Sequence, residues 1–210
     1  FPVYLTSAML LVLLVVVTRG FHLDGFMDVC DGLFGGHTAE HRLEIMRDSH
    51  VGAFAVAGGA SLLILKYGAL LSLLVLAEES YHGKEWALLL FPMLSRWAMV
   101  VATVVFPYAR RQGMGTPFHQ GSTKLVAAIA AVVVIIASLF LGGIGGAGML
   151  IGVSILAWAL GLVMAHMLGG LTGDAYGAIN EMAEAAILVA AVALIQYGLL
   201  EPLPQLLGGN

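Results

Sequence analysis

Three aspartates near the start of the chain have a spacing that suits metal chemistry. Asp24, Asp28 and Asp31 stand at i, i+4 and i+7 within residues 22–32. In a helix this spacing puts all three carboxylates on one face, about a turn apart. Because like charges stacked in this way repel, something must offset the repulsion, and a divalent cation is the plainest candidate. Oxygen ligands favour Mg²⁺, Mn²⁺ or Ca²⁺. A solvated acidic face beside a membrane is the alternative, but the flanking residues are mostly apolar.

A second acidic set lies far along the chain. Glu181 and Glu184 are spaced i and i+3, and Asp174 lies two turns before Glu181 if the helix is continuous. Two acidic clusters that meet on one face would suit one or two metal ions.

Arginines accompany these acids, and a guanidinium group matches phosphate oxygens well. Arg47 begins a motif that runs to residue 52, and Arg110 and Arg111 precede a glycine-containing loop. For Arg110 and Arg111, anchoring of the membrane topology is an equal alternative to phosphate binding. Arg96 lies inside an apolar segment, where it either pairs with an acid or holds a phosphate.

Two histidines, His22 and His50, lie in these motif stretches and can bind metal, shuttle protons or hydrogen-bond phosphate. Carboxylates beside arginines and flexible glycines indicate phosphoryl-type transfer, in which catalysis is mostly positioning and charge neutralisation. The sequence has no Gly-x4-Gly-Lys-Ser/Thr motif, which argues against a P-loop enzyme.

The elements that must position these residues are membrane helices. The chain is 60% hydrophobic and only 10% charged, which excludes an ordinary soluble domain. We predict an all-α, polytopic transmembrane bundle of about six spans, with a short interfacial helix at 39–48. The expected spans are 1–17, 51–77, 86–106, 125–141, 149–168 and 185–200. Residues 1–210 are expected to form one membrane domain that lacks its native N-terminal segment, since the chain starts at Phe1 in an apolar run.

The placement of lysine and arginine predicts the orientation. Loops 18–50, 107–124 and 169–185 share one side of a six-span bundle, and the opposite loops hold only Lys84. The shared side carries six basic residues: Arg19, Arg42, Arg47, Arg110, Arg111 and Lys124. This side is therefore expected to face the cytoplasm. Because the acidic motifs lie in the same loops, the polar chemistry should converge there.

Four stretches resemble a known family in the right order along nearly the whole chain. They are HLDGFMDVCDG at 22–32, RLEIMRDSHVGAF at 42–54, SRW at 95–97 and GGLTGDAYGAINE at 169–181. They resemble the adenosylcobinamide-GDP ribazoletransferases, the cobalamin 5′-phosphate synthases of prokaryotes. The resemblance implies a Mg²⁺-dependent inner-membrane enzyme. It would join adenosylcobinamide-GDP to α-ribazole or its 5′-phosphate and release GMP.

The resemblance also implies residue roles and partners. Asp31 would be the base for the ribazole 3′-hydroxyl, which attacks the phosphate nearest the cobinamide. Catalytic roles fall on Asp28, Asp31, Arg47 and His50, substrate binding on Arg47, Arg96, Arg110, Arg111, His22 and Asn180, and metal binding on Asp24, Asp28, Asp31, Asp174 and Glu181. The expected partners are the two substrates and the lipid bilayer, with no nucleic acid. A second copy of the chain and other cobalamin-pathway enzymes are further candidate partners.

Two other functions fit parts of the pattern. A CDP-alcohol phosphotransferase also places acids at helical spacing, but its motif has Asp-Gly-x2-Ala-Arg, whereas Gly25 is followed here by Phe-Met-Asp. A cation transporter should place its acids in the middle of spans. Here the acids lie at span ends, and only Lys66 and Arg96 are deep.

Overall fold

The computed structural model describes residues 1–78, 84–109, 123–200 and 202. The described segments are helical and contain no strand beyond an isolated bridge, so the all-α prediction is confirmed. The helices are α1 (Val3–Val17), α2 (Phe21–Gly35), α3 (Ala39–Ile45), α4 (Ala53–Glu78), α5 (Lys84–Val105), α7 (Lys124–Leu168) and α8 (Gly173–Gln196). Within the described residues, four helices are long and apolar enough to cross a membrane, or five if α1 and α2 count as one broken span.

The first expected span is broken. With 15 residues, α1 is about 22 Å long, short of the roughly 30 Å of a bilayer core. The Thr18 hydroxyl donates to the carbonyls of Leu14 and Val15. Arg19 and Gly20 then adopt positive φ angles of 53° and 69°, and α2 leaves at 85° to α1. Residues 18–50 are therefore not the expected loop, because most of the acidic stretch lies within a second helix.

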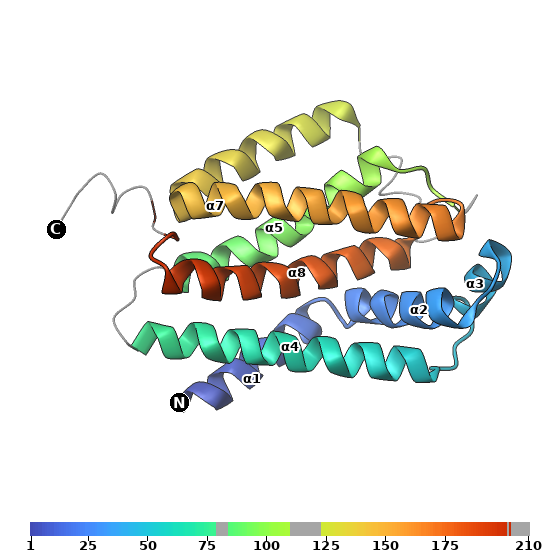
Figure 1. Ribbon diagram of the computed structural model, residues 1–210, viewed down its shortest axis with the longest axis horizontal. Coiled ribbons are helices and arrows are strands. Elements are labelled where there is room, and N and C mark those ends of the chain that lie inside the picture. The colour runs from blue at the N-terminus through green and yellow to red at the C-terminus, as the bar shows by residue number, and fades with distance from the viewer. Residues whose placement is uncertain (79–83, 110–122, 201, 203–210) are drawn as a thin grey trace.

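One helix accounts for two of the expected spans. A straight helix of 45 residues would be about 67 Å long, but α7 turns at Gly143, where φ is 53° and ψ is −134°. Figure 1 shows the two halves of α7 folded back alongside each other. The expected glycine-rich turn at 142–148 thus reduces to a break at Gly143. We expected six membrane spans, and the described residues contain four or five candidate spans. Part of the difference arises because α7 counts as one helix but covers two of the expected spans.

The central helix is α8, which packs against α2, α4, α5 and α7. It begins at Gly173, where the Thr172 side chain accepts a hydrogen bond from the Ala175 N–H. The expectation that this span starts near residue 185 is wrong. Residues 174–184 are helical and mostly buried, so their acids belong to the core helix rather than to a loop.

Three of the four motif segments lie towards one end of the bundle, and the fourth, residues 95–97, lies midway along α5. Figure 1 shows α3, the end of α5 and the starts of α7 and α8 at that end, with the α7 turn and the end of α8 at the other. The connections there are tied together, because Ala109 N–H donates to Leu171 O and Leu171 N–H donates to Pro107 O, both at 2.8 Å. This bridge holds the turn that leads into α8.

Candidate functional site

The start of the second acidic set, Asp174, lies beside the first where α2 crosses α8. A Cβ atom added to Gly25 would lie 2.9 Å from the Cα and the carbonyl oxygen of Asp174. A Cβ added to Gly177 would lie 3.1 Å from the His22 carbonyl oxygen. Glycine at both positions lets the two backbones touch, as small residues do in membrane helix pairs. The crossing places the start of α8 beside the aspartate motif of α2.

The aspartates of α2 lie in different environments. Asp24 is exposed, whereas Asp28 and Asp31 are half-buried. Asp31 accepts the Gly52 N–H at 2.7 Å through Oδ2 and the Ala55 N–H at 2.8 Å through Oδ1. It therefore caps the start of α4 from a neighbouring helix, satisfying backbone groups that a helix N-terminus leaves unpaired. Each carboxylate oxygen keeps a further lone pair for another ligand.

The predicted metal ligands do not form a ready cluster. Throughout the described ranges, no group of three or more His, Cys, Asp and Glu side chains is arranged to hold one metal ion. The five predicted ligands, Asp24, Asp28, Asp31, Asp174 and Glu181, all lie within those ranges. The arrangement does not test whether the protein binds Mg²⁺, and the metal site stays a prediction.

Glu181 instead lies in a buried ion-pair network. Lys66 Nζ donates to Glu181 Oε2 at 2.5 Å and to Glu184 Oε2 at 2.7 Å. Glu184 Oε1 accepts Arg96 Nη1 at 2.9 Å. Sequence reasoning gave Glu181 to the metal, placed Glu184 only in the second acidic set, and left Lys66 without a site role. The signal that could have found the network is a lysine within a membrane span, which needs a partner.

Asn180 and His22 extend this network towards the acidic motif. Asn180 is fully buried, and its Oδ1 accepts a hydrogen bond from Arg96 Nη1. Its Nδ2 lies 3.3 Å from His22 Nδ1, and it also donates to Glu184 Oε1 at 3.1 Å. Three predicted substrate-binding residues, His22, Arg96 and Asn180, are thus brought together by three different helices.

Other predicted residues lie on the segment before α4. Arg47 and His50 are both exposed. His50 donates its backbone N–H to Asp48 Oδ1 at 3.0 Å, and its ring Nδ1 lies 2.6 Å from the same oxygen. These hydrogen bonds, the backbone one first, lower the pKa of Asp48. Arg110 and Arg111 lie outside the described residues.

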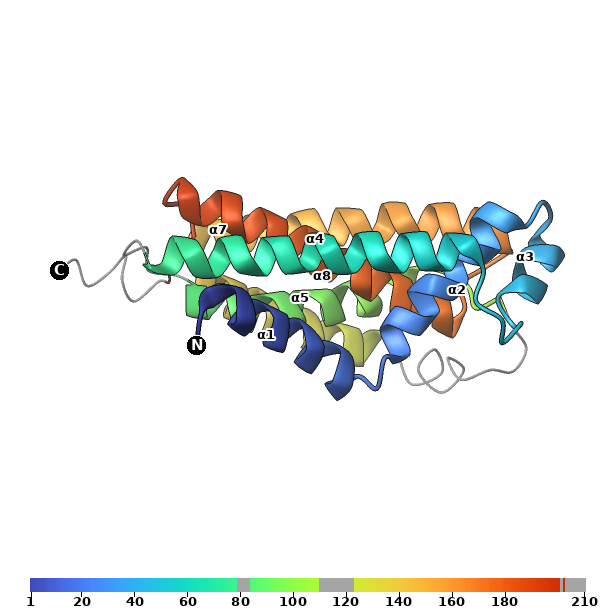
Figure 2. The ribbon, with the colours of Figure 1, turned by 90° about the horizontal axis from the view of Figure 1, so that it is seen from below.

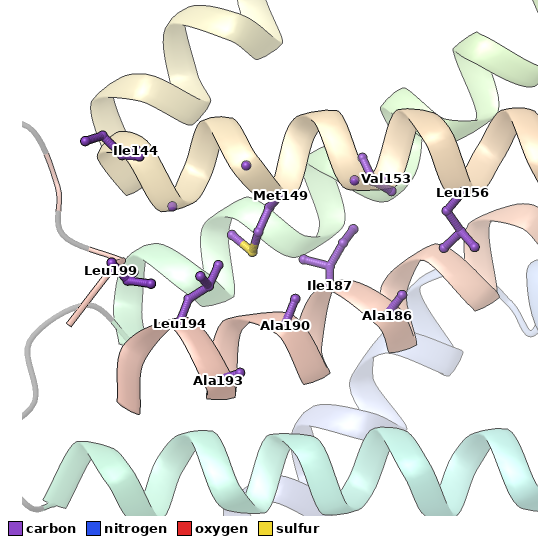
Figure 3. Close-up of a pocket in the computed structure, with 13 residues that line it drawn as sticks. Ile144, Met149, Val153, Leu156, Ala186, Ile187, Ala190, Ala193, Leu194 and Leu199 are labelled. Carbon is purple, nitrogen blue, oxygen red and sulfur yellow. The ribbon is translucent and has the colours of Figure 1, made fainter. Parts of the chain in front are cut away.

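Two large pockets in the described bundle are apolar and separate from this polar group. One of about 520 Å³ lies between α7 and α8, where Met149 and Val153 face Ile187 (Figure 3). The other, of about 950 Å³, is lined from α2, α4, α7 and α8 by residues such as Phe26 and Leu160. Apolar walls do not suit phosphate groups, so the polar residues around the α2–α8 crossing are the candidate site.

A family model and several curated relatives of one enzyme name match most of the chain. The family model for cobalamin-5-phosphate synthase matches residues 1–192. An adenosylcobinamide-GDP ribazoletransferase of Desulfitobacterium hafniense is 38% identical over 198 residues, which cover 93% of this chain and 76% of the relative. The protein of the same name in Desulforamulus reducens is 41% identical over 180 residues, which cover 85% of this chain and 69% of the relative. The one in Geotalea daltonii is 35% identical, covering 92% and 75%. No solved structure matches the chain.

Proposed function

Since the chain belongs to the cobalamin-5-phosphate synthase family and is an enzyme of cobalamin biosynthesis, we propose that it joins adenosylcobinamide-GDP to α-ribazole or its 5′-phosphate. The ribazole 3′-hydroxyl attacks the phosphate nearest the cobinamide. A new P–O bond forms, the bond to the GMP phosphate breaks, and GMP leaves while the hydroxyl proton passes to a carboxylate. The observation that carries this proposal is the family match along the chain, and the α2–α8 crossing supports it by bringing Asp174 beside the aspartate motif of α2.

We propose Mg²⁺ as the cofactor. The donor set fits the chemistry of this ion, which takes oxygen ligands and usually needs only one or two carboxylates besides water and substrate phosphates. Asp24, Asp28 and Asp174 are the first candidates, and Asp31 can contribute the lone pairs that its helix hydrogen bonds leave. When bound, Mg²⁺ would neutralise charge on the diphosphate. Glu181 would reach it only by leaving Lys66.

The remaining residues bind and orient the substrates in this proposal. Arg96 holds a phosphate, and Arg47 and His50 approach from the exposed segment before α4. His22 and Asn180 line the same region. Asp28 or Asp31 takes the proton. Arg110 and Arg111 remain predicted phosphate ligands, and the site is proposed to face the cytoplasm.

The test is a membrane assay of GMP release. Membranes containing the protein should release GMP from adenosylcobinamide-GDP only when Mg²⁺ and α-ribazole or its 5′-phosphate are both present, with the joined product identified by mass spectrometry. EDTA should stop the reaction and excess Mg²⁺ should restore it. Release of GMP without the acceptor would contradict the transfer, and full activity in EDTA would contradict the cofactor.

Asp28→Ala tests the residue assignment. We expect transfer to be abolished while the protein still folds and inserts, because Asp28 is a proposed metal ligand and its side chain is only half-buried. Glu44→Gln, on the exposed face of α3, is the matched control and should keep activity. Normal turnover by Asp28→Ala would remove Asp28 from the site.

A further inference from the structure

The buried network around Lys66 is balanced in charge and joins three helices. Lys66 comes from α4, Arg96 from α5, and Glu181 and Glu184 from α8. Lys66 and Glu184 are each 2% exposed. Two cations face two carboxylates, which is what burial of ionised groups requires, because an unpaired charge in this environment is costly.

Arg96 is the one member that reaches out of this network. Its Nη1 donates to Glu184 Oε1 at 2.9 Å, to Ser95 Oγ at 3.1 Å and to Asn180 Oδ1. Within the described part of the chain, every hydrogen bond of the Arg96 side chain is donated by Nη1. The Arg96 side chain is nevertheless 41% exposed, against 3% for its partner Glu184. One edge of the guanidinium is therefore fixed, and the donors on Nη2 and Nε have no described partner.

The guanidinium of Arg96 is thus held on one side and exposed on the other. A guanidinium with one fixed nitrogen and open donors at the other positions can receive a phosphate in a defined orientation. Lys66 holds the second oxygen of Glu184, so that carboxylate cannot rotate away from Arg96. Lys66 also offsets the charge of Glu181, which would otherwise repel an anionic substrate.

We propose that Lys66 and Glu184 are positioning residues, which hold Arg96 so that its open donors bind a phosphate of the nucleoside-diphosphate-linked substrate. The inference rests on the proposed function for the identity of that substrate. It assigns a role to two residues outside the acidic motifs of α2. Their effect is transmitted through Arg96 and does not involve contact with the reacting atoms.

A double-mutant cycle separates positioning from general support of the fold. Glu184→Gln should raise the KM for adenosylcobinamide-GDP roughly 10-fold, as loss of a group that orients a ligand typically does, with a smaller change in kcat. The KM for α-ribazole 5′-phosphate should stay unchanged, because Arg96 is proposed to bind the other substrate. In an Arg96→Gln background, Glu184→Gln should add little. Equal changes in both KM values, or effects that multiply in the double variant, would overturn the inference.

Lys66 has its own variants and control. Lys66→Met should give the same selective rise in KM, whereas Lys124→Met, exposed at the start of α7, should change nothing. If Lys66→Met does not accumulate in membranes, Lys66→Arg keeps the charge, and its different fork geometry should still raise the KM for adenosylcobinamide-GDP. A folded Lys66 variant with unchanged KM values would contradict the role.

A binding measurement keeps this inference distinct from the reaction. The rise in melting temperature that adenosylcobinamide-GDP gives the purified protein requires no turnover. If transfer is normal but the effects of Glu184→Gln and Arg96→Gln are independent, the inference is wrong and the proposed function is unaffected. Absent transfer, with the same coupling in the melting temperatures, would defeat the function and leave the inference standing.

Discussion

At the scale of single residues, the carboxylate of Asp31 connects the acidic motif to the start of α4. Both of its oxygens accept backbone N–H groups from that helix. Gly52 makes room for it, because a Cβ there would lie 2.5 Å from Asp31 Oδ1. Asp31 therefore has a structural role at the start of α4 in addition to its place in the acidic motif.

Asp31→Ala should therefore cost stability as well as activity. Loss of a helix cap costs about 1–2 kcal/mol, and the loss should appear as faster hydrogen exchange at the amides of Gly52 and Ala55. Asp24→Ala, which removes an exposed carboxylate, is the matched comparison and should leave these amides protected. Unchanged protection in Asp31→Ala would show that the cap is not formed in the membrane.

The residues that sequence could predict are those that depend on local spacing. The i, i+4, i+7 pattern is enough to place Asp24, Asp28 and Asp31 along one helix, and α2 confirms that they are helical. The pairing of Lys66 with Glu181 joins residues 115 apart, and no local pattern specifies which buried acid meets which buried cation. The contact of His22 with Asn180 could not be predicted from the sequence for the same reason.

At the scale of elements, the helices were predictable and their ends were not. Apolar runs located α4 and α5 within a few residues. The break at Arg19 and Gly20 and the early start of α8 depend on backbone angles and on capping by Thr172, which hydropathy does not report. The acidic stretch after Thr172 looked like a loop because its polar residues face protein rather than lipid.

The close α2–α8 crossing predicts that a single methyl group added at Gly25 destabilises the protein. Gly25→Ala would place a Cβ 2.9 Å from the Asp174 backbone, and overpacking of this kind costs roughly 1–3 kcal/mol. We expect a lower melting temperature and weaker transfer, because Asp174 would be pushed away from the aspartate motif of α2. Gly68→Ala, where an added Cβ meets nothing within 4 Å, is the control and should be neutral. Equal behaviour of the two variants would contradict the close crossing.

At the scale of the whole molecule, the bundle has two chemically different ends. Arg42, Arg47 and Lys124 lie at the end that carries α3, whereas Lys84 begins α5 at the opposite end. Arg42 Nη1 also donates to Met167 O at 3.1 Å, which ties α3 to the end of α7. Basic residues collect on the cytoplasmic side of membrane proteins, so the end with α3 should face the cytoplasm.

Cysteine labelling measures this orientation directly. In a Cys30→Ala background, Glu44→Cys lies on α3 and Tyr197→Cys lies just after α8, and both positions are exposed. A membrane-impermeant maleimide should label Glu44→Cys in inverted vesicles and Tyr197→Cys in right-side-out vesicles, with detergent exposing both. Labelling of both positions from the same side would contradict the two-ended bundle. Labelling with the sides exchanged would keep the two-ended fold but contradict the proposal that the site faces the cytoplasm.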